Sequence, residues 1–236
     1  MVDVYIDNNI LIDHERGEKT LPISAKVKYV YSYVHLQEMV ELGERLSAIK
    51  DKRLQVIEEL TACEYISNDD DNRLIIYPES PSRILAVINS PIAITLHQMF
   101  FNATTHGRVC ENPSFLMEAL GIEKKIVNNY TPKMLVEKHG DLIWYYISQT
   151  CALRQEEFQS LFNILDALGF WQDDVKEGSS MNRSYDANHA YFASVCDYFV
   201  TNDRNTRNKA NVAYELYGYK TKAVSYKEFV ELLYSI

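Results

Sequence analysis

Acidic residues stand at positions where an α/β fold would bring them together. Asp7 directly follows an apolar run that is typical of a buried strand, and Asp203 follows a second such run after a short polar turn. Glu38 lies near the apolar face of a helix predicted over 33–50, and Asp186 stands in the first turn of another predicted helix. Because parallel strands end at one edge of their sheet, where open α/β proteins bind ligands, we expect these acids to face one cleft.

Carboxylates crowded into one cleft need a positive partner to stay ionised, because neighbouring negative charges and burial both raise the pKa of each carboxyl group. Arg204 and Lys209 lie nearby in the sequence, but two cations do not balance four or five acids. A set of ligands made only of oxygen favours Mg²⁺ or Mn²⁺ over zinc. Such a centre suits phosphodiester hydrolysis, in which the metal activates water and stabilises the transition state.

Strands and helices alternate at both ends of the chain, which predicts a parallel sheet covered by helices on both faces. A helix after Asp203 should end at Gly218, and the pattern from Ser225 to Glu228 is a capping box that opens a last helix. The strands are expected at 2–6, 27–31, 74–77, 198–200 and 222–224. The helices are expected at 33–50, 54–66, 205–217 and 226–233.

The middle of the chain has a different character, and its periodicity predicts helices alone. These are expected at 82–105, 114–120, 132–138, 141–153 and 155–168, separated by turn signals that include Gly140. A polar, serine-rich stretch over 175–184 is the best candidate linker. We therefore predict an α/β domain formed by 1–77 and 182–236, interrupted by a helical insertion over 78–181.

Composition is that of a globular protein: the chain has 236 residues, of which 47% are hydrophobic. Its cysteines, at positions 63, 110, 151 and 196, form no C-x-x-C pair, and no signal peptide opens the sequence, so we expect reduced thiols and a cytoplasmic location. No apolar run reaches the ~18 residues of a membrane span, so no membrane partner is expected. A net charge of -9 argues against general nucleic-acid binding unless bound cations reverse the field near the acids.

Other chemistries fit the sequence less well. No Walker A, G-x-S-x-G, Rossmann glycine or H-E-x-x-H motif is present. The acidic run 68–72 is not a calcium loop, because Leu74 and Ser80 stand where an EF-hand needs Gly and Glu. His35 and His189 fall within the acid-bearing segments and could approach a substrate phosphate, although packed or surface histidines are the more common case.

Three segments together resemble the acidic motifs of the PIN-domain family of metal-dependent ribonucleases. They are VYIDNNILID, YSYVHLQEM and SYDANHAYFASVCDYFVTNDRNTRNKA. Their order is that of the family: Asp after the first strand, Glu on a helix, Asp opening a helix, and Asp in a T-x-D turn after a strand. The resemblance implies an α/β, PIN-like parallel sheet, with Asp7, Glu38, Asp186 and Asp203 as metal-binding and catalytic acids. The helical insertion lies outside it.

The same resemblance extends to residues around these motifs. Asp197 matches an acid often found before the fourth strand, so we expect it as a further metal ligand. Asn202 matches the variable middle position of the T-x-D turn and is expected to play a supporting polar role. With Arg204 and Lys209, it forms the expected substrate-binding set.

These observations favour a Mg²⁺- or Mn²⁺-dependent endoribonuclease that hydrolyses single-stranded RNA. A structure-selective DNA nuclease is an alternative, since the same metal centre can cut either backbone and single-stranded DNA can serve as substrate. A catalytically silent PIN-like scaffold is another. The sequence leaves open whether the protein forms a homo-oligomer or binds a regulatory protein.

Overall fold

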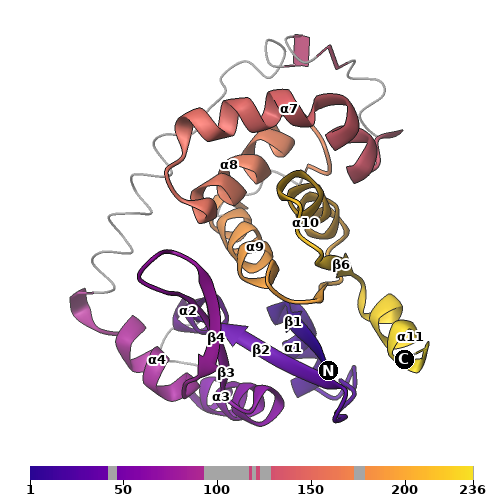
Figure 1. Ribbon diagram of the computed structural model, residues 1–236. Helices are drawn as coiled ribbons and strands as arrows, with labels where there is room; N and C mark the ends of the chain where they lie inside the picture. The colour runs from indigo at the N-terminus through magenta and orange to yellow at the C-terminus, as the bar shows by residue number, and fades with distance from the viewer. Residues whose placement is uncertain (42–46, 93–116, 119–120, 123–128, 173–178, 236) are drawn as a thin grey trace.

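The computed structural model describes residues 1–41, 47–92, 117–118, 121–122, 129–172 and 179–235. A mixed sheet lies in the lower half of the view in Figure 1, and helices cover it on both faces. The chain is therefore an α/β protein with a mostly parallel sheet, as its sequence predicts.

The strands are β1 (Val2–Ile6), β2 (Val27–Ser32), β3 (Glu64–Asn68), β4 (Leu74–Pro78), β5 (Tyr198–Val200) and β6 (Lys222–Val224). The helices on the first part of the chain are α1 (Asn8–Glu15), α2 (Tyr33–Glu41), α3 (Ser47–Thr61) and α4 (Pro81–Ile88). Those that follow are α7 (Pro132–Thr150), α8 (Arg154–Ala167), α9 (Ser179–Ala193), α10 (Arg204–Tyr217) and α11 (Tyr226–Ser235).

The sheet has six strands in the order β4-β3-β2-β1-β5-β6. Every neighbouring pair is parallel except β3 and β4, which are antiparallel. The register pairs Ile6 of β1 with Val200 of β5, so both strands end at the same level. The first residues after β1 and β5 therefore meet at one edge of the sheet, which we call the carboxyl edge.

Alternation along β1 divides the core into two halves. Val4 and Ile6 pack with α1, α3 and α11, whereas Tyr5 packs with α8, α9 and α10. Successive side chains of a strand point to opposite faces, so Asp7 continues on the face of Tyr5, under α9. Both faces are buried, as expected of parallel strands.

Helices α7 and α8 form an outer layer on α9 and α10 (Figure 1). Their apolar residues belong to the same buried cluster as Tyr5 and Phe199 of the sheet. The sequence context of Gly140 predicts a turn between two helices, but Gly140 lies within the single helix α7. A Cβ at this position would stand 3.1 Å from Cγ1 of Val136 in the same helix and 3.4 Å from Leu216 of α10, so the tighter contact would be within α7.

Several other boundaries differ from the sequence prediction, and α3 already begins at Ser47, within the helix expected over 33–50. Helix α3 ends at Thr61, because Ala62 and Cys63 adopt left-handed backbone angles, and β3 then begins at Glu64. Pairing of β3 with both β2 and β4 outweighs the helical pattern of 54–66. Part of the expected linker is helical as well, since α9 begins at Ser179. Of the helix expected over 82–105, α4 ends at Ile88 and 93–105 lie outside the described residues, as do 114–116 and 119–120 of the helix expected over 114–120.

Candidate metal centre

Asp7 is buried at the carboxyl edge, with 5% of its surface exposed. Its backbone N–H donates to the carbonyl of Val200, which extends the ladder between β1 and β5 by one residue. Its carboxylate oxygen Oδ2 accepts a hydrogen bond of 2.7 Å from the hydroxyl of Thr201. Thr201 in turn accepts from the backbone N–H of Asp203 at 3.1 Å. A single hydroxyl therefore links the first and last of the expected site acids.

Asp203 is the N-cap of α10. One oxygen of its carboxylate accepts from the backbone N–H groups of Asn205 and Thr206, at 2.7 and 3.0 Å. The free N–H groups and the dipole of a helix N-terminus stabilise negative charge there. The T-x-D turn thus presents a carboxylate beside Asp7 while it starts the next helix.

Glu38 approaches the same place from α2. Its oxygen Oε1 accepts a hydrogen bond of 2.7 Å from Nε2 of His189 on α9. Burial raises the pKa of Glu38, but the hydrogen bonds from His189 and Asn8 lower it by more, so that the pKa lies below its ordinary value. Glu38 therefore carries its charge, and 32% of its side chain remains exposed.

The environment of Asp7 has the opposite effect on its proton. Burial and the negative charges of Glu38 and Asp203 raise the pKa of Asp7, against the opposing effects of His189 and Thr201. Negative charge thus accumulates at the carboxyl edge without full compensation, which is the environment that a cation would relieve. Asp7, Glu38 and Asp203 lie close enough at this edge for the charges of Glu38 and Asp203 to raise the pKa of Asp7.

Asp186 lies on α9, half-buried, one turn before His189. Residues three apart share a face of a helix, so Asp186 and His189 are on the same side of α9. Because α9 leads into β5, the turn that carries Asp186 is further toward the carboxyl ends of the strands than His189 is. This placement is compatible with a fourth acid of the same centre.

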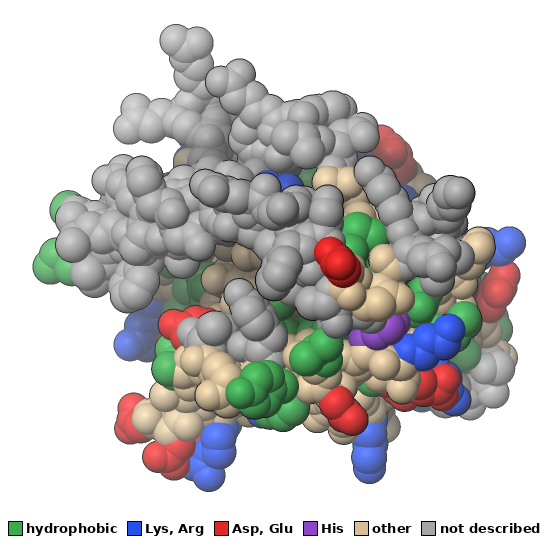
Figure 2. All heavy atoms as spheres, turned by 90° about the horizontal axis from the view of Figure 1, so that it is seen from above, with side chains coloured by type: hydrophobic (Ala, Val, Ile, Leu, Met, Phe, Trp, Pro, Cys, Tyr) green, Lys and Arg blue, Asp and Glu red, His purple; other side chains and the backbone are tan. Residues whose placement is uncertain are grey.

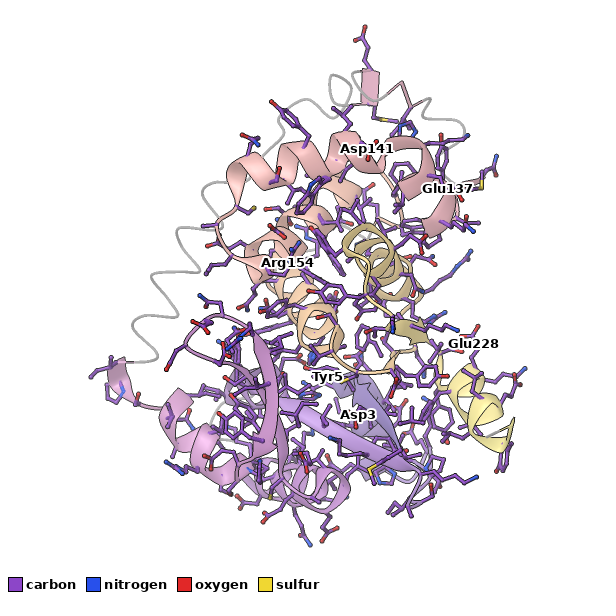
Figure 3. All side chains as sticks on the ribbon, viewed as in Figure 1. Asp3, Tyr5, Glu137, Asp141, Arg154 and Glu228 are labelled. Atoms are coloured by element: carbon purple, nitrogen blue, oxygen red, sulfur yellow. The ribbon has the colours of Figure 1, made fainter. Side chains whose placement is uncertain are left out.

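Asp197 is not brought to this edge. It precedes β5, and its Oδ2 accepts from the backbone N–H of Asp3 at 2.9 Å, near the beginning of β1. Figure 3 labels Asp3 and Tyr5, both of β1, and Asp3 is the nearer of the two to the beginning of the strand. Since β1 and β5 are parallel, Asp197 lies at the opposite end of the strands from Asp203. Its observed contact pairs β1 with β5, and we do not propose it as a metal ligand.

The expected substrate-binding residues have three different environments. Asn202 is exposed and accepts from the backbone N–H of Tyr226 at 3.2 Å, which ties the turn to the start of α11. Arg204 is exposed at the first position of α10. Lys209 is 1% exposed and forms an ion pair of 2.5 Å with Asp166 of α8. The expectation that Lys209 contacts a substrate is therefore not met in this structure, because the side chain is enclosed between α8 and α10.

Several residues of the centre were not singled out from the sequence. Thr201 is the clearest case, although it is the first residue of the T-x-D pattern that ends at Asp203. Asn8 is another: it is 3% exposed, and its Oδ1 meets no hydrogen-bond partner among the described residues. Arg207, which donates to the carbonyl of Thr201 at 2.9 Å, is a third. All three depend on contacts that a linear pattern does not contain.

The residues present fit a hard divalent cation. The donors at the carboxyl edge are carboxylate oxygens, and the buried Oδ1 of Asn8 beside Glu38 is a further oxygen without a partner in the described chain. Within the described ranges, no three acidic, histidine or cysteine side chains already stand together at the spacing of a metal site. The hydrogen bonds of Glu38 to His189 and of Asp203 to Asn205 and Thr206 each use one carboxylate oxygen, so a cation would bind the other oxygen of each acid.

The fold and this edge define a class: a parallel α/β protein with a carboxylate cluster where its central strands end. No family model, curated protein or solved structure matches the chain.

None of the described helices is long and apolar enough to cross a membrane. In Figure 2, acidic and basic side chains are interspersed over the described part of the face seen there.

Proposed function

We propose that this protein is a nuclease that hydrolyses phosphodiester bonds with the help of Mg²⁺ or Mn²⁺. The observation that carries the proposal is the convergence of Asp7, Glu38 and Asp203 at the carboxyl edge, where the pKa of the buried Asp7 is raised in part by the other two. Carboxylates that repel one another are retained at a functional site when a cation or a substrate needs them. The resemblance of the acidic motifs to the PIN-domain family supports the same chemistry.

The residues of the centre have distinct roles in this proposal. The acids that hold the metal are Asp7, Glu38, Asp186 and Asp203. The side-chain oxygen Oδ1 of Asn8 is a neutral ligand nearby. When bound, the metal supplies activation of a water molecule and stabilisation of charge in the transition state. Thr201 orients Asp7 relative to Asp203, and the exposed Arg204 is placed to meet a phosphate of the substrate.

We propose single-stranded RNA in the cytoplasm as the substrate. The family resemblance supports RNA, and the mixed charges on the described surface favour recognition through the metal and a few local contacts. The acids of α7 do not contribute, since Glu137 and Asp141 lie across the molecule from Tyr5 (Figure 3). DNA cleavage by the same metal centre is the alternative that the experiment must separate.

The test is cleavage of matched RNA and single-stranded DNA oligonucleotides with Mn²⁺, Mg²⁺ or EDTA. Asp7→Asn, Glu38→Gln, Asp186→Asn and Asp203→Asn should each lower the rate by about 10²-fold or more, because the loss of one ligand misplaces the metal. Asp197→Asn is the matched control, since it removes an acid at the opposite end of the strands and should cleave at close to the parental rate.

Each outcome decides between the proposals. Cleavage of RNA alone supports the endoribonuclease, and cleavage of DNA alone replaces it with the DNA nuclease. If folded parent protein cuts neither nucleic acid while it binds Mn²⁺, a silent scaffold is the better description. If all four site variants cleave like the parent, the centre is elsewhere.

A further inference from the structure

His189 lies at the point where α9 meets both the sheet and Glu38. Its Nε2 is 2.7 Å from Oε1 of Glu38, and its Nδ1 is 2.8 Å from the hydroxyl of Tyr5. Only 1% of the residue is exposed. Both ring nitrogens are occupied by protein partners, so His189 is not placed to touch a substrate or to exchange protons with one.

The hydroxyl of Tyr5 continues this chain into the core. It is 2.6 Å from Oγ of Ser32, which itself accepts from the backbone N–H of Val34 at 3.3 Å. Tyr5, Ser32 and His189 are each 1% exposed or less, so water does not replace these contacts. A buried polar chain with every group paired holds its members in one arrangement.

One order of protons satisfies these contacts when the imidazole of His189 is neutral. The ionised carboxylate of Glu38 only accepts, so Nε2 of His189 carries the ring proton and donates to it, and Nδ1 accepts from the hydroxyl of Tyr5. Because Tyr5 has a single proton to donate, its oxygen accepts from the hydroxyl of Ser32. Each donor meets an acceptor, and the imidazole tautomer is fixed by its two neighbours.

The neighbouring His35 holds the backbone of Ser32, the last residue of this chain of hydrogen bonds. Its Nε2 donates to the carbonyl of Ile6 at 2.7 Å, which leaves Nδ1 to accept from the backbone N–H of Ser32 at 3.1 Å. Burial and the neighbouring His189 lower the pKa of His35 to about 3, so its ring is neutral and can accept there. Ser32 is therefore held on both its backbone and its side chain.

We propose that His189 is a positioning residue, held by Tyr5 and Ser32, that fixes the carboxylate of Glu38 for metal binding. The inference rests on the proposed function, because it concerns the same centre. It assigns a role to a buried chain that reaches from the middle of β1 to the edge of the site. Groups that orient a ligand of a metal in this way contribute about 10–100-fold to metal affinity or activity.

The decisive experiment measures the dissociation constant of Mn²⁺ by calorimetry, with electron paramagnetic resonance of the bound ion as a second readout. His189→Leu removes the donor to Glu38 and should weaken Mn²⁺ binding about 10–100-fold. His189→Gln places an amide N–H near the position of Nε2 and should restore most of the affinity. Tyr5→Phe leaves the imidazole without its second partner and should fall between these two.

Tyr214→Phe is the matched control for Tyr5→Phe. Tyr214 is also buried, and its hydroxyl also bonds α9, but it donates to the backbone carbonyl of Ala190, at 2.9 Å, and not to the imidazole that holds Glu38. It should leave Mn²⁺ binding unchanged. A second comparison uses Glu38→Gln, in which adding His189→Leu should have no further effect on binding, since His189 acts through Glu38.

The outcomes separate this inference from the proposed function. If the parent protein binds no Mn²⁺, the proposed function fails and the inference fails with it. If the parent binds Mn²⁺ and folded His189→Leu binds it equally well, the inference alone is overturned. It is also overturned if His189→Leu weakens binding to the same extent with Glu38→Gln as without it, or if Tyr214→Phe is as harmful as Tyr5→Phe.

Discussion

The hydroxyl of Thr201 donates to Oδ2 of Asp7 at 2.7 Å, and its oxygen accepts from the backbone N–H of Asp203 at 3.1 Å. These contacts join the residue after β1 to the turn after β5. Thr201 is completely buried, so no water can take its place. The spacing of Asp7 and Asp203 therefore depends on one hydroxyl.

We predict that Thr201→Val weakens Mn²⁺ binding and destabilises the protein by about 1–3 kcal/mol. Valine fills the same volume, but it leaves the carboxylate of Asp7 and the backbone N–H of Asp203 without their hydrogen-bond partner. Thr201→Ser keeps the hydroxyl and is the matched control, with parental Mn²⁺ affinity and a loss of only about 1 kcal/mol for the missing methyl group. Urea unfolding and calorimetry measure both effects. Equal Mn²⁺ affinity in the two variants would show that Thr201 does not set the geometry of the acids.

The raised pKa of Asp7 leads to a prediction about stability. An acid whose pKa is higher in the folded than in the unfolded protein costs stability as the pH rises from its unfolded value, about 3.9, through its folded value. Above that value the whole cost is present. Asp7→Asn removes the charge, and the amide oxygen can still accept from Thr201. We therefore expect the variant to melt at a higher temperature than the parent at pH 7 in EDTA.

Mn²⁺ should reverse this order. Binding to the folded state stabilises the parent by roughly 2.7 kcal/mol at one hundred times the dissociation constant, and the variant much less. Greater stability of an inactive variant is expected at a site that is built for function. A variant that melts below the parent in EDTA, with no shift in Mn²⁺ for either protein, would mean that protein donors fully satisfy Asp7.

Local patterns in the sequence were sufficient to predict the central strands and the acids that follow them. An apolar run that ends in an acid marks both the strand and its carboxyl end, as Asp7 and Asp203 do. The last helix was predictable for a similar reason. The capping box of Ser225 and Glu228 is a local signal, and the structure contains both of its hydrogen bonds, at 3.2 and 2.7 Å.

Contacts between distant segments could not be predicted in this way. The pairing of β3 with β2 depends on Tyr31 and Tyr65, which are far apart in the sequence, and it overrides a helical pattern. The burial of Lys209 depends on Asp166 from α8. The chain from Tyr5 to His189 likewise joins residues 184 positions apart. Each of these needs the fold before it can be seen.

The ion pair between Lys209 and Asp166 gives a third prediction. Their side chains are 2% and 7% exposed, and Arg183 also lies 3.8 Å from the carboxylate of Asp166, so removing Asp166 leaves two cations without their acid. Asp166→Ala should destabilise the protein by about 3–5 kcal/mol, whereas Asp166→Leu combined with Lys209→Met and Arg183→Met should lose much less, because apolar residues of similar size replace the charges. Urea unfolding measures the difference. If Lys209→Met weakens RNA binding without a loss of stability, Lys209 is a substrate contact after all.

His35 gives a prediction about acid stability. Burial and His189 lower its pKa from 6.5 to about 3. Below pH 6.5, His35 therefore binds a proton in the unfolded chain but not in the folded protein. The stability from a neutral His35 is fully present above that pH and is lost as the pH falls toward 3, by an amount on the order of 4 kcal/mol.

The free energy of unfolding of the parent, measured in urea at intervals from pH 7.5 to 4.5, should fall more steeply than that of His35→Gln. The variant has no imidazole to titrate at this position, so the difference between the two curves isolates His35 from the carboxylates that protonate in the same range. The difference in slope should approach that of one proton, about 1.4 kcal/mol per pH unit, at the acid end. Parallel curves would show that His35 takes up its proton equally well in the folded protein, and that its Nδ1 does not depend on accepting from the backbone N–H of Ser32.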